Sequence, residues 1–205
     1  MIYFLFSIFV KSQIVCLIPY KSIPMKIYWL LLSLFLFSSQ SVSSQNLVIN
    51  EIITSNSNVL TADDGSYEDW VELFNNGSEP INLQGYGLSD NSALPFQWVF
   101  PEYWIQSGEH LLIWCSDKNQ TNPLQPFHTN FKISSSGEPI TLTDNFGNVV
   151  DSFPATIIPQ NFSYGRTPSG SITFSIFQEP TPGTSNPNEN TFNELSAPQF
   201  SVNSG

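Results

Sequence analysis

Short runs of β-prone residues recur along the chain after residue 45, separated by glycine, asparagine, aspartate, proline or serine. No stretch there keeps a 3.6-residue period, so the pattern predicts strands rather than helices. Alternation is clear where Ile140 and Leu142 point one way and Thr141 and Thr143 the other. The predicted strands are Leu47–Ile53, Asp69–Phe74, Ile81–Leu83, Tyr86–Ser89, Gln97–Phe100, His110–Cys115, Pro139–Thr143, Asn148–Phe153 and Ile172–Phe177.

Two of these segments carry further information about the fold. The run His110–Cys115 is apolar on both faces, as expected for a central strand that is covered on both sides. Asp144–Gly147, between two predicted strands, is typical of a hairpin loop that contains glycine. Many short strands with such turns predict an all-β fold, an Ig-like β-sandwich of two sheets.

Residues 1–44 have the three parts of a secretory signal. Lys26 provides a basic start, 27–37 form an apolar centre, and a small polar stretch leads to cleavage near Ser43 or Ser44. The apolar centre is shorter than the roughly 20 residues of a membrane span. We therefore expect a secreted, extracellular or cell-surface protein without a stable membrane span in its mature chain.

A second apolar piece, MIYFLFSIFV, precedes this signal. We expect translation to begin at Met25, so that the first 24 residues, this piece included, precede the true start of the protein. An unusually long leader or a membrane-tethered N-terminus is the alternative.

The other end of the chain changes composition after residue 186. Pro180–Gly183 ends the strand pattern, and the residues that follow are rich in asparagine, serine and proline, as in linkers. Ala197–Val202 resumes as a possible strand. We expect one domain over 46–186, then a linker and the start of a possible further β-domain over 187–205, in a fragment truncated at Gly205; a genuine short tail is the alternative.

Charge narrows the classes of partner. After Gln45, the 3 basic residues Lys118, Lys132 and Arg166 stand against all 17 acids, which leaves a net charge of −14. Binding of phosphate backbones or anionic membranes needs clustered lysine and arginine, so we expect no direct nucleic-acid partner. The same part of the chain holds one cysteine, Cys115, which excludes an internal disulfide there and predicts a small buried hydrophobe.

Leu47 to Asn186 resemble the lamin tail domain in its secreted bacterial form. The matching blocks are VINEI, EDWVELFNNGSEPINLQGYGLSDN, WVFP, SGEHLLIWCS, HTNFKISSSGEPITLTDNFGNVVDS, SYGRTPSG and PTPGTSN, in family order. The resemblance implies an Ig-like sandwich, in agreement with the strand pattern. It implies no catalytic residues.

The resemblance implies different roles in nuclear lamins and in bacterial proteins. In nuclear lamins the domain mediates protein contacts, but this chain lacks heptads, a basic import cluster and a CaaX box. In bacteria similar domains accompany exported hydrolases, nucleases, spore-coat-type kinase domains or surface repeats. We therefore expect a non-catalytic protein-interaction, adhesion or spacer module; the alternative is the N-terminal accessory domain of a larger exported enzyme.

The acidic and histidine residues do not form a recognisable site. The densest acidic stretch lacks the ligand alternation of an EF-hand, and we interpret it as a solvated loop and strand ends, with calcium as the alternative. Asp69 and Glu72, three apart in a strand, should point to opposite faces. His110 and His128 lack the neighbours of a metal site, and His128 should pack or hydrogen-bond at a loop. The residues of the densest acidic stretch are Asp63, Asp64, Glu68, Asp69 and Glu72.

The remaining candidates are equally limited. Ser89-Asp90-Asn91 matches one element of serine β-lactamases, whose partner elements are absent. Arg166, the one arginine of the chain, should form a structural ion pair or backbone contacts. We predict no catalytic, cofactor-binding or metal residues and expect a protein or cell-surface glycan partner.

A glycan would need an exposed aromatic platform. Core packing is the favoured role for most of the large aromatic side chains, and Tyr103 and Trp104 are the pair expected to reach the surface. The candidates are Trp70, Phe96, Trp98, Phe100, Tyr103, Trp104 and Trp114.

Overall fold

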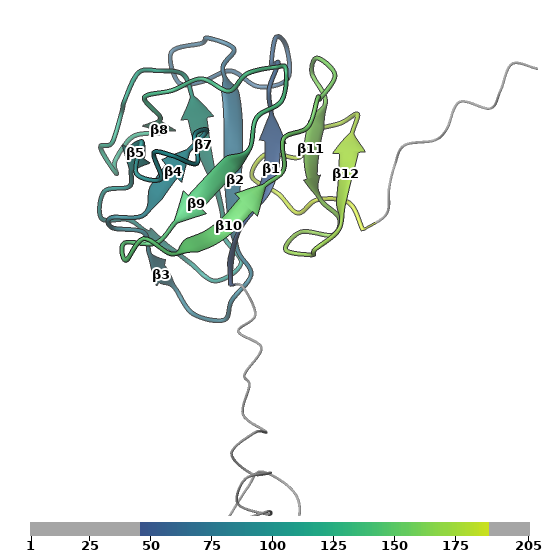
Figure 1. The fold of residues 1–205 in the computed structure, drawn as a ribbon. Helices are drawn as coiled ribbons and strands as arrows, with labels where there is room; N and C mark the ends of the chain where they lie inside the picture. The colour runs from purple at the N-terminus through teal and green to yellow at the C-terminus, as the bar shows by residue number, and fades with distance from the viewer. Residues whose placement is uncertain (1–45, 189–205) are drawn as a thin grey trace, which may run out of the picture. The chain divides into compact units, whose positions relative to one another are not determined.

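The computed structural model describes residues 46–188, and every regular element in this range is a strand (Figure 1). The expected leader over 1–44 and the possible strand over 197–202 lie outside the described residues. The strands are β1 (Leu47–Ile53), β2 (Asp69–Asn75), β3 (Ile81–Asn82), β4 (Gly87–Ser89), β5 (Trp98–Val99), β6 (Trp104–Ile105), β7 (His110–Cys115), β8 (Phe127–His128), β9 (Ile140–Thr143), β10 (Val149–Phe153), β11 (Ser163–Arg166) and β12 (Phe174–Phe177).

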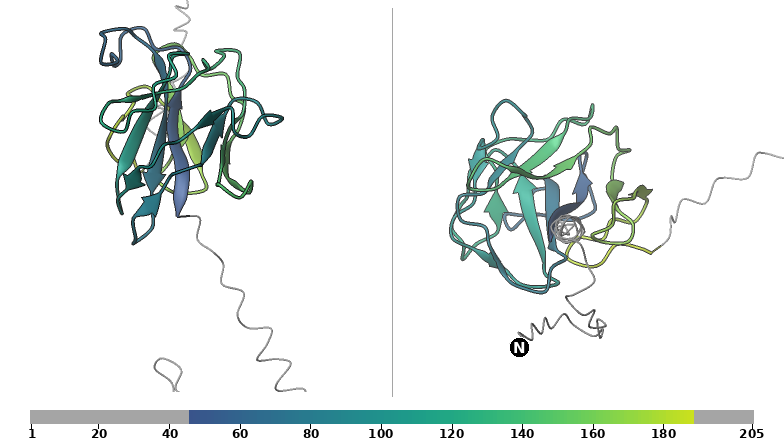
Figure 2. Two further views of the ribbon diagram at one scale, coloured as in Figure 1. Left: turned by 90° about the vertical axis from the view of Figure 1, so that its left-hand side faces the viewer. Right: turned by 60° about the horizontal axis from the view of Figure 1, so that its bottom comes forward.

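The strands of residues 46–188 form two facing sheets and a small extra ladder. The larger sheet has the order β12-β11-β1-β2-β7-β8, the smaller one β10-β9-β4-β5, and β3 pairs with β6. Pairing is antiparallel in the described part except between β7 and β8, which are parallel. The two layers are visible in Figure 2. The predicted all-β, Ig-like sandwich is therefore confirmed.

The main core fills the space between the two sheets. Side chains at alternate positions of β2 and β7, such as Val71, Leu73 and Ile113, point inward because successive strand residues face opposite sides. Trp98, from the smaller sheet, packs edge-on against aromatic neighbours in this core; its ring centroid lies 4.6 Å from that of Phe100 and 5.8 Å from that of Phe127.

A second, smaller core lies on the outer face of the larger sheet. Ile53, Trp70 and Trp114 point to this side and are covered by Ala62 and its loop neighbours. The alternate residues of β7 thus enter two different cores. The prediction that His110–Cys115 is covered on both faces is confirmed.

Sequence reasoning missed three strands, Trp104–Ile105, Phe127–His128 and Ser163–Arg166. Two of them contain only two residues, too few for any periodicity to be recognised. Ser163–Arg166 carries serine, glycine and arginine, yet it is buried between β1 and β12. Its extended conformation comes from ladder pairing on both sides rather than from β propensity.

Some predicted turns and strand boundaries agree with the structure, and others differ from it. Gly147 has φ 90° and donates its N–H to the Asp144 carbonyl, which confirms the hairpin loop between β9 and β10. The strand predicted to begin at Ile172 begins instead at Phe174, because Ile172 lies in an exposed turn. Among residues 46–188 the structure contains no helix long and apolar enough to cross a membrane.

Candidate functional site

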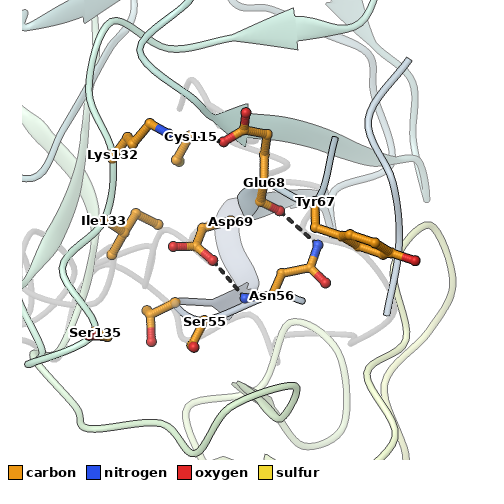
Figure 3. A pocket seen from close by; sticks show the side chains of 10 residues that line it. Ser55, Asn56, Tyr67, Glu68, Asp69, Cys115, Lys132, Ile133 and Ser135 are labelled. Carbon is orange, nitrogen blue, oxygen red and sulfur yellow. Dashed lines mark hydrogen bonds and ion pairs between the residues drawn. The ribbon is translucent and has the colours of Figure 1, made fainter. Parts of the chain in front are cut away.

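An open hollow of about 310 Å³ lies where β1 ends and β2 begins (Figure 3). Its walls are mostly polar, although Ile133 and the buried Cys115 also line it. Asp69 points across the hollow toward Ile133, while Glu68 points toward Lys132. The lining residues are Thr54, Ser55, Asn56, Tyr67, Glu68, Asp69, Cys115, Lys132, Ile133 and Ser135.

The strand register places Asp69 at the inner wall of this hollow. Asp69 pairs with Cys115 across the β2–β7 ladder, so the two side chains share a face. One carboxylate oxygen of Asp69 accepts the backbone N–H of Asn56 at 2.9 Å. Burial raises the pKa of Asp69 from 3.8 to about 6, because desolvation outweighs that hydrogen bond.

Glu68, next to Asp69, has a different environment. Its Oε1 lies 3.3 Å from Nζ of Lys118 and its Oε2 lies 3.4 Å from Nζ of Lys132. Both lysines of the folded domain are therefore directed to Glu68, and Lys118 also reaches Asp64 at 2.6 Å. Among the ion pairs of residues 46–188, none includes Asp69.

A second hollow is lined by Asp63, Lys118 and His128, and His128 also contacts Ser116 behind it, which gives a serine–histidine–aspartate series. Nδ1 of His128 lies 2.8 Å from Oγ of Ser116, and Nε2 lies 3.0 Å from Oδ1 of Asp63. The same residue types perform acyl transfer in serine hydrolases, where the serine faces the substrate and the aspartate is buried. Here the order is reversed, since Ser116 is 4% exposed and the Asp63 side chain 51% exposed.

This reversed order assigns the three side chains a structural role. The buried hydroxyl of Ser116 is not accessible to a substrate, whereas both ring nitrogens of His128 are engaged. The predicted hydrogen bonding of His128 is confirmed, but His128 lies in β8 rather than in a loop. His110 is likewise bound, with Nδ1 2.8 Å from Oε1 of Glu72 and its ring stacked on Phe74.

Glu72 corrects the prediction of a solvated acidic stretch. It points away from Asp69, as predicted, but it is fully buried on the outer face of the larger sheet. Oε1 of Glu72 accepts the side-chain N–H of Asn50 at 3.0 Å, and Oε2 accepts the backbone N–H of Gly183 at 2.6 Å. Residues 180–186, called the strap below, cover it from solvent.

A second buried carboxylate, Glu51, binds the same strap. It accepts the backbone N–H of Thr181 at 3.0 Å and contacts the hydroxyl of Ser163. Its Oε2 lies 2.9 Å from Oγ1 of Thr181, which lies 3.0 Å from Oδ1 of Asn186. Desolvation by burial, with a smaller effect from the neighbouring Glu72, raises the pKa of Glu51 from 4.5 to about 7.

The hydroxyl of Thr181 explains why a protonated Glu51 suits this geometry. Thr181 has one hydroxyl hydrogen but two acceptor oxygens within reach, on Glu51 and Asn186. When Oε2 of Glu51 carries a proton, it donates to Thr181, and Thr181 donates to Asn186. Both contacts are then hydrogen bonds.

Arg166 forms the predicted structural ion pair. Its Nη2 lies 2.9 and 2.8 Å from the two carboxylate oxygens of Asp151, and its Nε donates to the Ile49 carbonyl at 2.8 Å. The guanidinium also lies 4.6 Å from the centroid of the Phe174 ring. Arg166 therefore links β1, β10, β11 and β12.

The other residues considered from the sequence, Cys115 and Ser89, make contacts within the fold. Cys115 is buried, and burial raises the pKa of its thiol. Ser89 contacts the Asn91 carbonyl within its own turn at 2.8 Å. Among residues 46–188, no group of three or more histidine, cysteine, aspartate or glutamate side chains could hold a metal ion.

The aromatic predictions divide between core and surface. Trp104 is 52% exposed, as expected. Tyr103 is half-buried and packs edge-on against Phe127, with its hydroxyl 2.8 Å from Oε1 of Glu109. The two side chains thus do not form a shared exposed platform.

Sequence reasoning did not single out Thr54, Glu51 or Thr181. Glu51 stands inside an apolar run, VINEI, and a carboxylate among apolar strand residues is the signal that could have identified it. Thr54 has no such signal, because a threonine at a strand end is common.

Comparison with known proteins identifies one family. The lamin tail domain family model matches residues 40–156, more than half of the chain. No curated protein matches the chain. The described fold continues past this match, since β11 pairs with β1 and the strap binds Glu51 and Glu72. The chain, with its VINEI and EDWVELFNN blocks in paired strands of an Ig-like sandwich, belongs to the lamin tail domain family.

Proposed function

We propose that this lamin tail domain is a non-catalytic module of a secreted or cell-surface protein, and that it binds a protein partner through the smaller sheet. Domains of this family are typically non-catalytic. The observation that carries the proposal is an exposed apolar surface on the outer face of the smaller sheet. We call it the outer-sheet patch; it comprises Phe96, Val99 and Val149.

The strand register brings the members of the outer-sheet patch together. Val149 pairs with Thr143, Thr143 with Gly87, and Gly87 with Val99, so their positions form one row on one face. A Cβ at Gly87 would lie 2.9 Å from Cδ1 of Phe96, which shows that this ring lies against the glycine. Gly87 therefore leaves space for Phe96 in this row, between Thr143 and Val99.

Exposure and charge indicate the kind of partner. Phe96 is 43%, Val99 41% and Val149 63% exposed, although each is a large apolar side chain. Apolar side chains gathered on one face are typical of protein-contact surfaces. Because the chain after residue 45 carries a net charge of −14, we expect a partner with an apolar centre and a basic rim.

Site-specific cross-linking tests this proposal. The full chain would carry a photoreactive phenylalanine analogue at position 99 or 149, with position 184 on the opposite layer as control. We expect protein adducts from the cell-surface fraction at 99 and 149, and their loss when the other valine is changed to lysine. Equal adducts at 184, or retention on insoluble glycan that depends on Trp104 instead, would refute a protein partner at this patch.

Export is a separate part of the proposal and rests on the basic and apolar segments over 26–37. Mass spectrometry of the protein recovered outside the cell tests it directly. We expect a mature N-terminus at about Gln45. A peptide that contains Tyr3 to Val10 in the exported protein would contradict cleavage there.

A further inference from the structure

The strap is held over the larger sheet by polar contacts. Among the described residues, neither of the two apolar cores contains a side chain of the strap. Its middle, from Gly183 to Ser185, is exposed, and Asn186 at its end is buried. A segment without buried apolar contacts can open while the rest of the fold stays intact.

The part of the strap above the carboxylates is a tight turn. The N–H of Thr184 donates to the Thr181 carbonyl at 3.1 Å, which closes a turn of four residues. Its central residues are Pro182 and Gly183, and Gly183 has φ 78°, as a type II turn requires. The turn can therefore move as a unit, because its shape depends on its own residues rather than on the sheet.

Two N–H groups of this turn end on buried carboxylates. Thr181 donates to Oε1 of Glu51 at 3.0 Å, and Gly183 donates to Oε2 of Glu72 at 2.6 Å. The β1–β2 register pairs Glu51 with Glu72, so the two side chains lie together on the outer face of the larger sheet. Both residues are fully buried beneath the turn.

Neutral groups fix the two ends of the segment that carries the turn. The side-chain N–H groups of Asn186 donate to the Asn50 carbonyl at 3.2 Å and to the Arg166 carbonyl at 2.8 Å, and its backbone N–H donates to Oγ of Ser169 at 2.8 Å. At the other end the chain leaves β12 at Phe177, which is fully buried. None of these contacts changes charge with pH, whereas the contacts of the turn with the carboxyl groups do.

We propose that the Thr181–Thr184 turn is a pH-sensitive lid, which closes over Glu51 and Glu72 in mildly acidic solution and opens as Glu51 ionises. In the closed lid, a protonated Oε2 of Glu51 donates to Oγ1 of Thr181, 2.9 Å away. Loss of this proton leaves a buried charge beside Glu72, and opening lets water solvate it. The lid needs no bound partner and is independent of the outer-sheet patch.

The titratable groups around Glu51 come from two neighbouring strands. Glu72 faces it from β2, and His110 of β7 contacts Glu72, with Nδ1 2.8 Å from Oε1. From β11 the contact is the neutral hydroxyl of Ser163, and the strap has no titratable side chain. Among the ion pairs of residues 46–188, none includes Glu51. An ionised Glu51 therefore has no cation to offset its burial.

The pKa of Glu51 sets the pH range in which the lid opens. Desolvation raises this pKa from 4.5 to about 7 in the closed lid, and access of water returns it to its ordinary value in the open lid. A pKa that is raised in the closed state favours closure below pH 4.5, and this preference is lost as the pH rises through 7. The ratio of open to closed lids should therefore rise about 40-fold between pH 5 and pH 7.

Amide hydrogen exchange of the full chain tests the lid. Protection of the Thr181 and Gly183 N–H groups, corrected for the intrinsic exchange rate at each pH, reports how often the lid opens. The N–H groups of Val71 and Ile113, in the main core, report unfolding of the whole domain. We expect the lid amides to exchange at least about 100-fold faster than the core amides and to lose about 40-fold in protection from pH 5 to pH 7.

Two glutamine variants assign the pH dependence. Glu51→Gln cannot ionise, so its lid amides should keep at pH 7 the protection that they have at pH 5. Glu102→Gln is the matched control, because it makes the same change at an exposed residue between β5 and β6. This control should retain the full pH dependence of the unmodified chain.

A third variant tests the proton that closes the lid. Thr181→Val removes the hydroxyl that accepts from Glu51, so lid exchange should rise more at pH 5 than at pH 7. A larger rise at pH 7 would show that Thr181 donates to an ionised Glu51, contrary to the proposal. This variant decides if Glu51→Gln does not fold.

Two further outcomes would overturn the lid. Equal exchange of lid and core amides would show that the strap opens only when the whole domain unfolds. An unchanged pH dependence in Glu51→Gln would assign the effect to His110 instead.

Discussion

Replacing Glu51 with glutamine should change how the stability of the domain depends on pH. Glu51 is buried beneath the strap, and desolvation raises the pKa of its carboxyl in the folded protein from 4.5 to about 7. Between pH 4.5 and pH 7, Glu51 is protonated in the folded state but ionised in the unfolded state. The contribution of Glu51 to the free energy of unfolding is therefore complete below pH 4.5 and is lost as the pH rises through 7.

The magnitude follows from the same two pKa values. Each pH unit over which only the folded state is protonated changes the free energy of unfolding by about 1.4 kcal/mol. Between pH 4.5 and 7 the loss is about 3 kcal/mol, which lowers the melting temperature of a domain of this size by roughly 10 °C. Asp69, whose pKa is raised to about 6, contributes in the same direction over a narrower range.

Glutamine is the matched replacement because it resembles a protonated glutamate in shape and in hydrogen bonding. Its carbonyl accepts from Ser163 and from the Thr181 N–H, and its amide donates to Oγ1 of Thr181. Urea unfolding at several pH values between 4.5 and 8 would measure the effect. We expect Glu51→Gln to exceed the unmodified chain in stability above pH 7 and to keep only the smaller slope from Asp69.

Two outcomes would refute this reasoning. An unchanged slope in Glu51→Gln would show that Glu51 is ionised throughout this pH range. Lower stability of the variant at pH 8 would show that the charged carboxylate binds the strap better than a neutral group does.

Three further predictions concern buried residues of the strands. Arg166→Met leaves Asp151 buried without its cation and should destabilise the domain by about 3–5 kcal/mol in urea unfolding. Adding Asp151→Leu should recover part of this loss, although it also removes the acceptor of the Ile49 N–H; no recovery would show that the unpaired charge of Asp151 is not the main source of the loss. The thiol of Cys115 should react with a disulfide reagent at the rate of unfolding and not faster. Gly87→Ala places a Cβ 2.2 Å from the Pro95 carbonyl oxygen and should lower the melting temperature by several degrees, while Ser78→Ala at an exposed site should not.

The core of the sandwich was largely predictable from the sequence. Alternation in β9 and the doubly apolar run of β7 each specify which side chains enter the main core, because a strand has a period of two residues. The alternation in β9 did not show that Thr141 and Thr143 are buried as well. Arg166 was predicted to be structural because a lone arginine in an acidic chain has many possible carboxylate partners. Its actual partner, Asp151, was not predictable, since 17 acids give no preference.

The candidate site was much less predictable. The sequence showed an acidic stretch from Asp63 to Glu72, but the structure divides it among separate environments. Asp63 binds His128, Glu68 binds two lysines, Asp69 lines a hollow, and Glu72 is buried beneath the strap. Neighbours in sequence diverge because a strand sends them to opposite faces and a loop turns them aside.

By itself, the sequence determined the class of fold, the positions of the long strands and the charge of the domain, because these follow from local periodicity and composition. It also carried the lamin tail blocks. Tertiary structure alone decided which of the carboxylates are buried, that a series of serine, histidine and aspartate has its serine hidden, and that Asp69 lines a hollow. Burial and hydrogen bonding depend on contacts between segments that are distant in the chain, such as the strap against β1 and β2. The local sequence pattern does not predict these contacts.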